Sequence, residues 1–145
     1  MAIALLSLLG VFVSAYLYLY KIGKIGTLAC GAGGCEAVQL SRWSSFLGVD
    51  VALLGLIGYL GLFGLALAGL RPDLTARRGV AAALLAASGV GVLFAGYLTY
   101  LELFVIHAIC FWCVSSAVII TIVCVLAGFD LRRAESLAHR DALPS

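Results

Sequence analysis

Two pairs of cysteines are the residues whose type and spacing could do chemistry. Cys30 and Cys35 enclose the glycine-rich stretch Gly-Ala-Gly-Gly, and Cys110 and Cys113 enclose Phe-Trp in a C-x-x-C motif. On a helix, a C-x-x-C places its sulfurs one turn apart, and a helix N-terminus can lower the pKa of the first thiol. A glycine-rich loop bends easily, so its disulfide would be mobile and accessible to attack. The spacing predicts thiol–disulfide exchange between the two pairs, through a mixed disulfide.

Two other interpretations of the four cysteines remain open at this point. A C-x-x-C in an apolar helix is also compatible with inert packing thiols. Four thiolates at these spacings could instead hold a tetrahedral Zn²⁺ ion. The fifth cysteine, Cys124, lies eleven residues beyond Cys113, about 16 Å further along a helix. We interpret Cys124 as a packed apolar residue.

The composition indicates what kind of scaffold holds these thiols. Hydrophobic residues make up 64% of the 145 residues and charged residues only 11%, whereas a soluble domain has about 25% charged residues. This excludes a soluble enzyme and a disordered chain, which needs low hydrophobicity and high charge. The net charge of +2 is too small to indicate nucleic-acid binding. The chain is therefore predicted to be an integral membrane protein in contact with lipid.

Four apolar stretches are long enough to cross the hydrocarbon core, which requires about 20 residues per helix. The sequence predicts an all-α membrane protein, a bundle of four transmembrane helices, with spans at residues 2–20, 51–70, 79–101 and 103–129. The bundle would form one catalytic domain over residues 1–131, followed by a short polar tail, 132–145. The first span has no basic n-region and no small-residue cleavage site, so it is interpreted as a retained anchor rather than a signal peptide.

The distribution of positive charge predicts the orientation of the bundle. With four spans, both termini share a side with the second loop, and the first loop, 21–50, shares the other side with the third. The first side carries six basic residues, Arg71, Arg77, Arg78, Arg132, Arg133 and Arg140, and the second carries three, Lys21, Lys24 and Arg42. The positive-inside bias places the termini in the cytoplasm. All four paired cysteines would then lie on the outer face, where they can meet.

The first outer loop contains one more pattern. Leu40, Trp43 and Leu47 recur at helical spacing among polar residues between Glu36 and Leu47. This predicts a short helix lying in the membrane interface. Such a helix could be a lid over the outer end of the bundle or only an interfacial linker.

Beyond the cysteines, several residues match a known family. The matching residues are Cys35-x-x-Val38-x-x-Ser41-x-Trp43-Ser44-x-x-x-Gly48 and Tyr97-Leu98-x-Tyr100, the latter ahead of the C-x-x-C. In these residues the chain resembles the vitamin K epoxide reductase family, particularly its bacterial homologues, and the resemblance covers essentially the whole chain. Oxidoreductases of the DsbB type carry their C-x-x-C in the first outer loop, whereas here it belongs to the fourth helix.

The resemblance implies an activity and roles for the cysteines. Such proteins couple the oxidation of thiols outside the membrane to the reduction of a quinone held in the bundle. Cys110 and Cys113 would be the active-site pair, with Cys113 nearer to the quinone. Cys30 and Cys35 would be the shuttle pair that exchanges with an extracytoplasmic thioredoxin-like partner of the DsbA type. The acceptor would be menaquinone, ubiquinone or phylloquinone, with no metal.

The resemblance also suggests a set of supporting residues. Ser44 would belong to the interfacial helix that caps the quinone pocket, and Trp43, Phe111 and Trp112 would be pocket or interface aromatics. His107 lies one turn before Cys110 and could support its thiolate or supply a proton, although a solvated histidine is the more common case. Two outer-face carboxylates, Glu102 and Asp50, could pair with Lys24 or Arg42; we expect them only to mark helix ends.

Departures from the family pattern limit the expected reaction. Asp50 stands where bacterial members often have Pro, and Ala117 where the vertebrate enzymes carry Tyr. Those enzymes also use an Asn in the second helix, and this chain contains no Asn. Plain quinone reduction is therefore expected rather than epoxide reduction. The short tail predicts a separate thiol partner rather than a fused thioredoxin-like domain, and the expected location is a bacterial cytoplasmic membrane.

Overall fold

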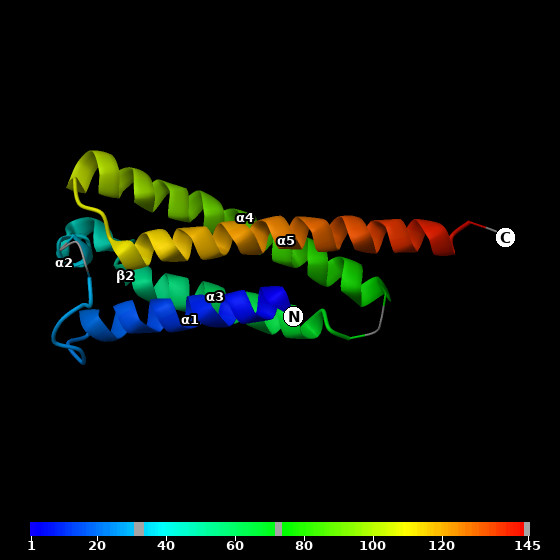
Figure 1. Ribbon diagram of the computed structural model, residues 1–145, viewed down its shortest axis with the longest axis horizontal. Helices are drawn as coiled ribbons and strands as arrows, with labels where there is room; N and C mark the ends of the chain where they lie inside the picture. Colours follow the sequence, from blue (N-terminus) through cyan, green and yellow to red (C-terminus); the bar gives the residue numbers. More distant parts are fainter. Residues whose placement is uncertain (31–33, 72–73, 144–145) are drawn as a thin grey trace.

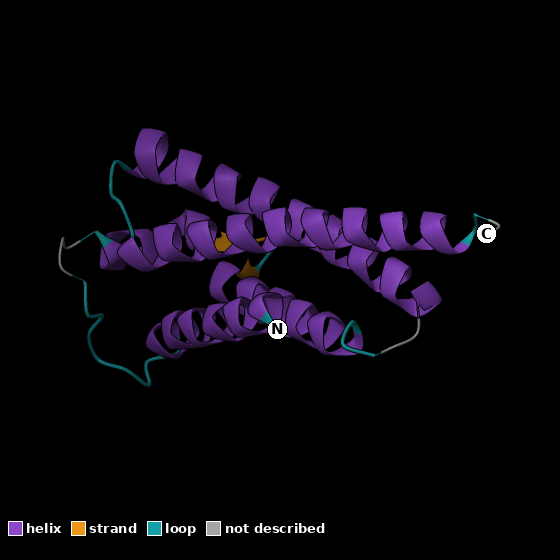
Figure 2. Cartoon of the chain, turned by 45° about the vertical axis from the view of Figure 1, so that its right-hand side comes forward, coloured by secondary structure: helices purple, strands orange, loops and turns teal. Residues whose placement is uncertain are grey.

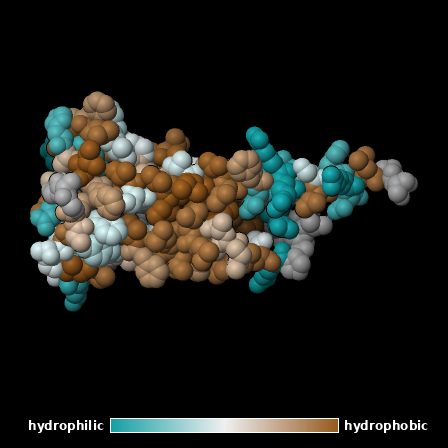
Figure 3. Space-filling model, in the orientation of Figure 1, coloured by the Kyte–Doolittle hydropathy of each residue, from teal (hydrophilic) through white to brown (hydrophobic). Residues whose placement is uncertain are grey.

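The structure is a computed structural model that describes residues 1–30, 34–71 and 74–143. Four long helices run along its length (Figures 1 and 2): α1 (Ala2–Lys21), α3 (Val51–Ala68), α4 (Leu74–Leu101) and α5 (Phe111–Asp141). Within the described residues, four helices are long and apolar enough to cross a membrane. A hydrophobic band crosses the middle of the visible surface, and polar residues gather at both ends (Figure 3). The predicted four-helix membrane bundle is confirmed.

The bundle is assembled from two helix pairs. α1 packs mainly on α3, and α4 packs mainly on α5, while α1 also contacts α5. Small residues allow these close approaches, as is usual where helices pack in lipid. A side chain at Gly10 of α1 would collide with the ring of Tyr59 on α3. Tyr59 in turn donates a hydrogen bond to the Ser116 carbonyl oxygen of α5, at 2.8 Å, which joins the two pairs.

The segment between α1 and α3 folds over one end of the bundle, and we call residues 35–50 the cap. The cap consists of α2 (Cys35–Leu40), the 3₁₀ turn η1 (Arg42–Ser44) and the antiparallel strands β1 (Ser45–Phe46) and β2 (Val49–Asp50). The prediction of one helix from Glu36 to Leu47 was therefore wrong in its second half. The helix ends because Ser41 is extended and bonds its hydroxyl to the Val38 carbonyl, at 2.7 Å. Leu47 and Gly48 then both adopt positive φ, as a two-residue hairpin turn requires.

One lysine ties the cap to two long helices. Lys21, the last residue of α1, forms an ion pair with Asp50 at 3.3 Å and donates hydrogen bonds to the carbonyl and the hydroxyl of Ser44. Asp50 also caps α3 by accepting a hydrogen bond from the Ala52 N–H at 3.3 Å. Asp50 thus marks a helix end as expected, but it pairs with Lys21 rather than with Lys24 or Arg42.

The junction of α4 and α5 differs from the sequence-based boundary. The chain does not leave the third span at Glu102: a π-helical turn, η2 (Glu102–Ile106), extends α4 by five residues. His107 then takes a left-handed conformation, with φ of 54°, and α5 starts at Phe111 with Cys110 as its N-cap. The fourth span was therefore predicted to begin too early, at residue 103. At its other end α5 continues to Asp141, so most of the predicted polar tail is helical.

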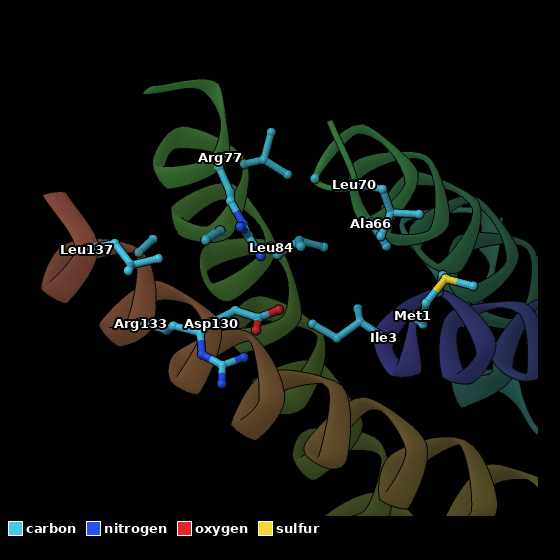
Figure 4. Close-up of a pocket in the computed structure, with 14 residues that line it drawn as sticks. Met1, Ile3, Ala66, Leu70, Arg77, Leu84, Asp130, Arg133 and Leu137 are labelled. Atoms are coloured by element: carbon cyan, nitrogen blue, oxygen red, sulfur yellow. The ribbon is translucent and has the colours of Figure 1, made fainter. Parts of the chain in front are cut away.

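Both termini lie away from the cap (Figure 1). A cavity of about 230 Å³ opens at that end between α1, α3, α4 and α5. Met1, Leu84, Arg77, Asp130 and Arg133 are among its lining residues (Figure 4). No cysteine lines it, so the thiol chemistry belongs to the other end of the bundle.

Candidate redox site

The two cysteine pairs lie at the same end of the bundle. Cys30 and Cys35 form a disulfide, with their Cα atoms 6.3 Å apart, and Cys35 begins α2 in the cap. Cys110 and Cys113 are free thiols at the N-terminus of α5. Cys35 and Cys110 belong to the same buried cluster, with 1% and 0% of their surfaces exposed. The predicted mobility of the glycine-rich stretch concerns residues 31–33, which lie outside the described part of the chain.

A backbone contact holds the two pairs next to each other. Gly34 lies so close to the carbonyl oxygen of Ile109 that a side chain at this position would collide with it. Gly34 directly precedes Cys35, and Ile109 directly precedes Cys110. Because glycine lacks a Cβ, it lets two backbones approach closely. The residues that flank one cysteine of each pair are thus in direct contact.

Two aromatic residues fix the chain on the other side of the disulfide. The Ala29 N–H donates to the hydroxyl of Tyr16 at 3.0 Å, and Trp112 Nε1 donates to the Ala29 carbonyl at 3.1 Å. The rings of Tyr16 and Trp112 lie 5.1 Å apart. Ala29 precedes Cys30, and Trp112 stands inside the C-x-x-C. A side chain between Cys110 and Cys113 therefore holds the loop that carries the other pair.

The thiol of Cys110 is placed to act as a thiolate. Its Sγ accepts a hydrogen bond from the Cys113 N–H, at 3.4 Å, in the N-cap position of α5. The Cys113 side chain, together with that N–H, holds the pKa of the Cys110 thiol below its usual value, although burial and Glu102 act in the opposite direction. Free N–H groups at a helix N-terminus stabilise a negative charge in this way.

Glu102 is the most unusual residue of the site, and its role was not predicted from the sequence. Glu102 does not merely mark a helix end: it is 3% exposed, and its Oε2 accepts a hydrogen bond from the Cys110 N–H at 3.1 Å. Glu102 and Cys113 also line the same small cavity. A usable signal was present, because an ionisable residue inside an otherwise apolar stretch is by default a functional candidate. Placing a span boundary at Glu102 hid that signal.

A small cavity lies between the cap and the C-x-x-C. Its volume is about 30 Å³, and it is lined by Val38, Gln39, Ser41, Trp43, Ser44, Val51, Leu98, Leu101, Glu102, Ile106 and Cys113. Gln39, a second residue that sequence reasoning missed, is 6% exposed and places Nε2 3.9 Å from Cys113 Sγ.

Apolar walls with a few polar groups and a redox thiol suit the ring of a quinone. The volume, however, is about that of one water molecule. The chemistry of the lining therefore suits a quinone ring, whereas the volume is too small to hold one.

The predicted supporting residues separate into two groups. Trp43 and Ser44 line this cavity, whereas Phe111 and Trp112 do not. Phe111 is exposed at the surface. His107 is exposed, and its Nδ1 lies 3.2 Å from the Leu103 carbonyl of its own turn.

The described residues contain no group of three or more His, Cys, Asp or Glu side chains that could hold a metal ion. With Cys30 and Cys35 joined in a disulfide, only two thiolates of the four could act as ligands. The four cysteines are thus arranged as one disulfide and two free thiols.

Comparison with known families agrees with this geometry. A model described as the Vitamin K epoxide reductase family matches residues 1–127. The match covers the first three long helices, the cap, both cysteine pairs and more than half of α5. The chain therefore belongs to the vitamin K epoxide reductase family, whose members are oxidoreductases.

Proposed function

We propose that the protein is a quinone-reducing thiol oxidase that makes disulfides for a separate extracytoplasmic thioredoxin-like partner of the DsbA type. The observation that carries the proposal is the backbone contact between Gly34 and Ile109, the residues that precede Cys35 and Cys110. This contact holds the Cys30–Cys35 disulfide near the turn that presents Cys110 and Cys113. Cys113 in turn borders an apolar cavity under the cap.

The proposed exchange begins at the loop pair. A dithiol of the partner reduces the Cys30–Cys35 disulfide and becomes a disulfide itself. A loop thiolate then attacks the oxidised Cys110–Cys113 pair and forms a mixed disulfide, which the second loop thiol resolves. The result is an oxidised loop and a reduced C-x-x-C, so two electrons have moved inward. A bound quinone supplies a two-electron, two-proton acceptor that reoxidises the C-x-x-C.

The chain's own residues prepare this exchange. The Cys113 N–H stabilises the Cys110 thiolate, and a stabilised thiolate leaves a disulfide faster when the loop thiol resolves it. Trp112 and Tyr16 fix Ala29, next to Cys30. The cap, clamped by Lys21 through Ser44 and Asp50, covers Cys113 and limits the access of water, which would hydrolyse or divert reactive intermediates.

The test is a thiol count on the purified, reduced protein in detergent. Alkylation followed by intact mass would be measured before and after a soluble quinone is added. We expect the loss of two to four alkylatable thiols, with Cys124 still free, and no loss in Cys113→Ala. An unchanged thiol count in the presence of quinone would contradict the proposal.

We also propose that the cysteine-bearing end faces the outside of a bacterial cytoplasmic membrane. The support is the charge distribution, because Arg77 and Arg133 line the cavity at the opposite end, with Arg78 and Arg132 next to them in sequence, and basic residues favour the cytoplasmic side. A membrane-impermeant maleimide applied to intact cells should label Thr27→Cys but not Ser136→Cys. Both positions are exposed, so the reverse pattern would invert the assignment.

A further inference from the structure

Glu102 occupies a position that the exchange described above does not use. It sits on the π-helical turn η2, a rare conformation that is frequent at functional sites. Its carboxyl accepts the Cys110 N–H at 3.1 Å, and Glu102 lines the cavity under the cap together with Cys113. It thus touches the C-x-x-C and the space where an electron acceptor would bind.

The surroundings of Glu102 favour an uncharged carboxyl group. The residue is 3% exposed and belongs to a segment able to span a membrane, where an unpaired charge is costly. Among the described residues, no Lys, Arg or His forms an ion pair with it: Lys21 pairs with Asp50, and Arg78 pairs with Glu135. A helix-capping role alone does not require a carboxyl, because an amide oxygen can accept the Cys110 N–H equally well.

We propose that Glu102 is a catalytic proton carrier: its uncharged carboxyl gives a proton to the acceptor in the cavity when the C-x-x-C is oxidised, and the Cys113 thiol proton then restores it. The inference rests on the proposed function. With Cys110 as a thiolate, oxidation by a quinone breaks the Cys113 S–H bond, forms one S–S bond and yields a quinol that holds both electrons and two protons. One of these protons comes from Glu102, which the Cys113 thiol reprotonates. The second proton is taken up from solvent at the acceptor.

The test compares Glu102→Gln with wild type in two measurements on reduced protein. The amide keeps the size of the side chain and an acceptor for Cys110 N–H but cannot carry a proton. The first measurement needs no quinone: N-ethylmaleimide is added, and the alkylation rate of Cys113 is followed by peptide mass. Addition of a thiol to a maleimide also transfers the thiol proton. We expect a rate reduction of at least about tenfold, because general acid–base catalysis contributes about 10²–10⁴-fold.

The second measurement is single-turnover reduction of a soluble quinone by the reduced C-x-x-C. We expect Glu102→Gln to slow it by about 10²–10⁴-fold. The control is Glu36→Gln, which makes the same chemical change at an exposed carboxylate near the disulfide and should leave both rates unchanged.

Both rates must fall for the proposal to stand. A structural defect would loosen the site and make Cys113 alkylation faster, so unchanged or faster alkylation overturns the proton role. Quinone reduction within threefold of wild type overturns it as well. If wild type itself fails to reduce quinone, the proposed function is wrong. A normal rate in Glu102→Gln, by contrast, overturns only the proton role of Glu102.

Discussion

The two cysteine pairs differ in what holds them in place. The Cys110–Cys113 pair is set by its own helix, because an N-cap and the next turn of α5 fix the distance between the thiols. The Cys30–Cys35 pair is set by distant residues: Gly34 against Ile109, and Ala29 between Tyr16 and Trp112. One pair depends on local structure and the other on tertiary contacts.

This difference matches the two tasks of the proposed oxidase. A pair that delivers electrons to an acceptor in the bundle benefits from fixed geometry. A pair that receives electrons from another protein must be reachable, and Cys30 is partly exposed whereas Cys110 is fully buried. Substitutions that separate the two tasks are therefore the most informative.

The largest effect is expected from Cys113→Ser, at the thiol that borders the cavity. A hydroxyl cannot form the disulfide, so quinone reduction should fall to the uncatalysed rate. The Cys30–Cys35 disulfide should still form, because its contacts do not involve Cys113. Quinone absorbance and intact mass after alkylation would measure the two results.

Cys124→Ser is the matched control for that experiment, as Cys124 is a half-buried free thiol further along the same helix. Its activity should equal that of wild type. Quinone reduction that survives in Cys113→Ser would show that the C-x-x-C is not the electron donor to the quinone. The two pairs would then not have the separate tasks proposed for them.

The second prediction separates the transfer of electrons from the C-x-x-C to quinone from the renewed reduction of the C-x-x-C through the loop pair. The double variant Cys30→Ser, Cys35→Ser keeps the complete C-x-x-C, so a chemically reduced sample should reduce one equivalent of quinone at nearly the wild-type rate. It should not turn over repeatedly with a thioredoxin-like dithiol as electron source, because Cys110 is fully buried. Stopped-flow single turnover and steady-state assays would give the two rates. Sustained turnover would mean that the loop pair is dispensable.

The sequence predicted the parts of the site that depend on local pattern. Apolar stretches specified four spanning helices, and parity of the spans put the loop cysteines and the C-x-x-C at one end. These inferences succeeded because hydrophobic length and the one-turn spacing of a C-x-x-C are local properties. The pairing of Cys30 with Cys35 is equally local, since only four residues separate them.

Features that depend on tertiary contacts could not be predicted from the sequence. The π-helical turn that buries Glu102 leaves no mark in hydrophobic periodicity, so a charge was taken for a span boundary. Gln39 was treated as part of a polar helix face, although it points to Cys113. The resemblance suggested Trp112 only as a pocket or interface aromatic, and nothing in the sequence indicated that its indole N–H bonds to Ala29, 83 residues away.

The third prediction concerns the close backbone contact between Gly34 and Ile109, which holds the two pairs near each other. Gly34→Ala should leave the helices intact, because the φ of −87° at Gly34 is accessible to alanine. Its Cβ would nevertheless collide with the Ile109 carbonyl, and overpacking of this kind costs about 1–3 kcal/mol. We expect transfer from the loop pair to the C-x-x-C to slow by roughly tenfold or more, with single-turnover quinone reduction unchanged. Gly26→Ala, at a loop position with open space, is the control.

The smallest effect is expected from Trp112→Phe. Phenylalanine keeps the aromatic contact with Tyr16 but loses the hydrogen bond from Nε1 to the Ala29 carbonyl. A hydrogen bond of this kind contributes about 1 kcal/mol, and 1.4 kcal/mol corresponds to about tenfold in an equilibrium. Exchange between the pairs should therefore slow by about fivefold, while single-turnover quinone reduction changes less than twofold. If Trp112→Phe instead slowed quinone reduction more than exchange between the pairs, Trp112 would act on the C-x-x-C itself rather than on the loop. The two pairs would then not be positioned independently.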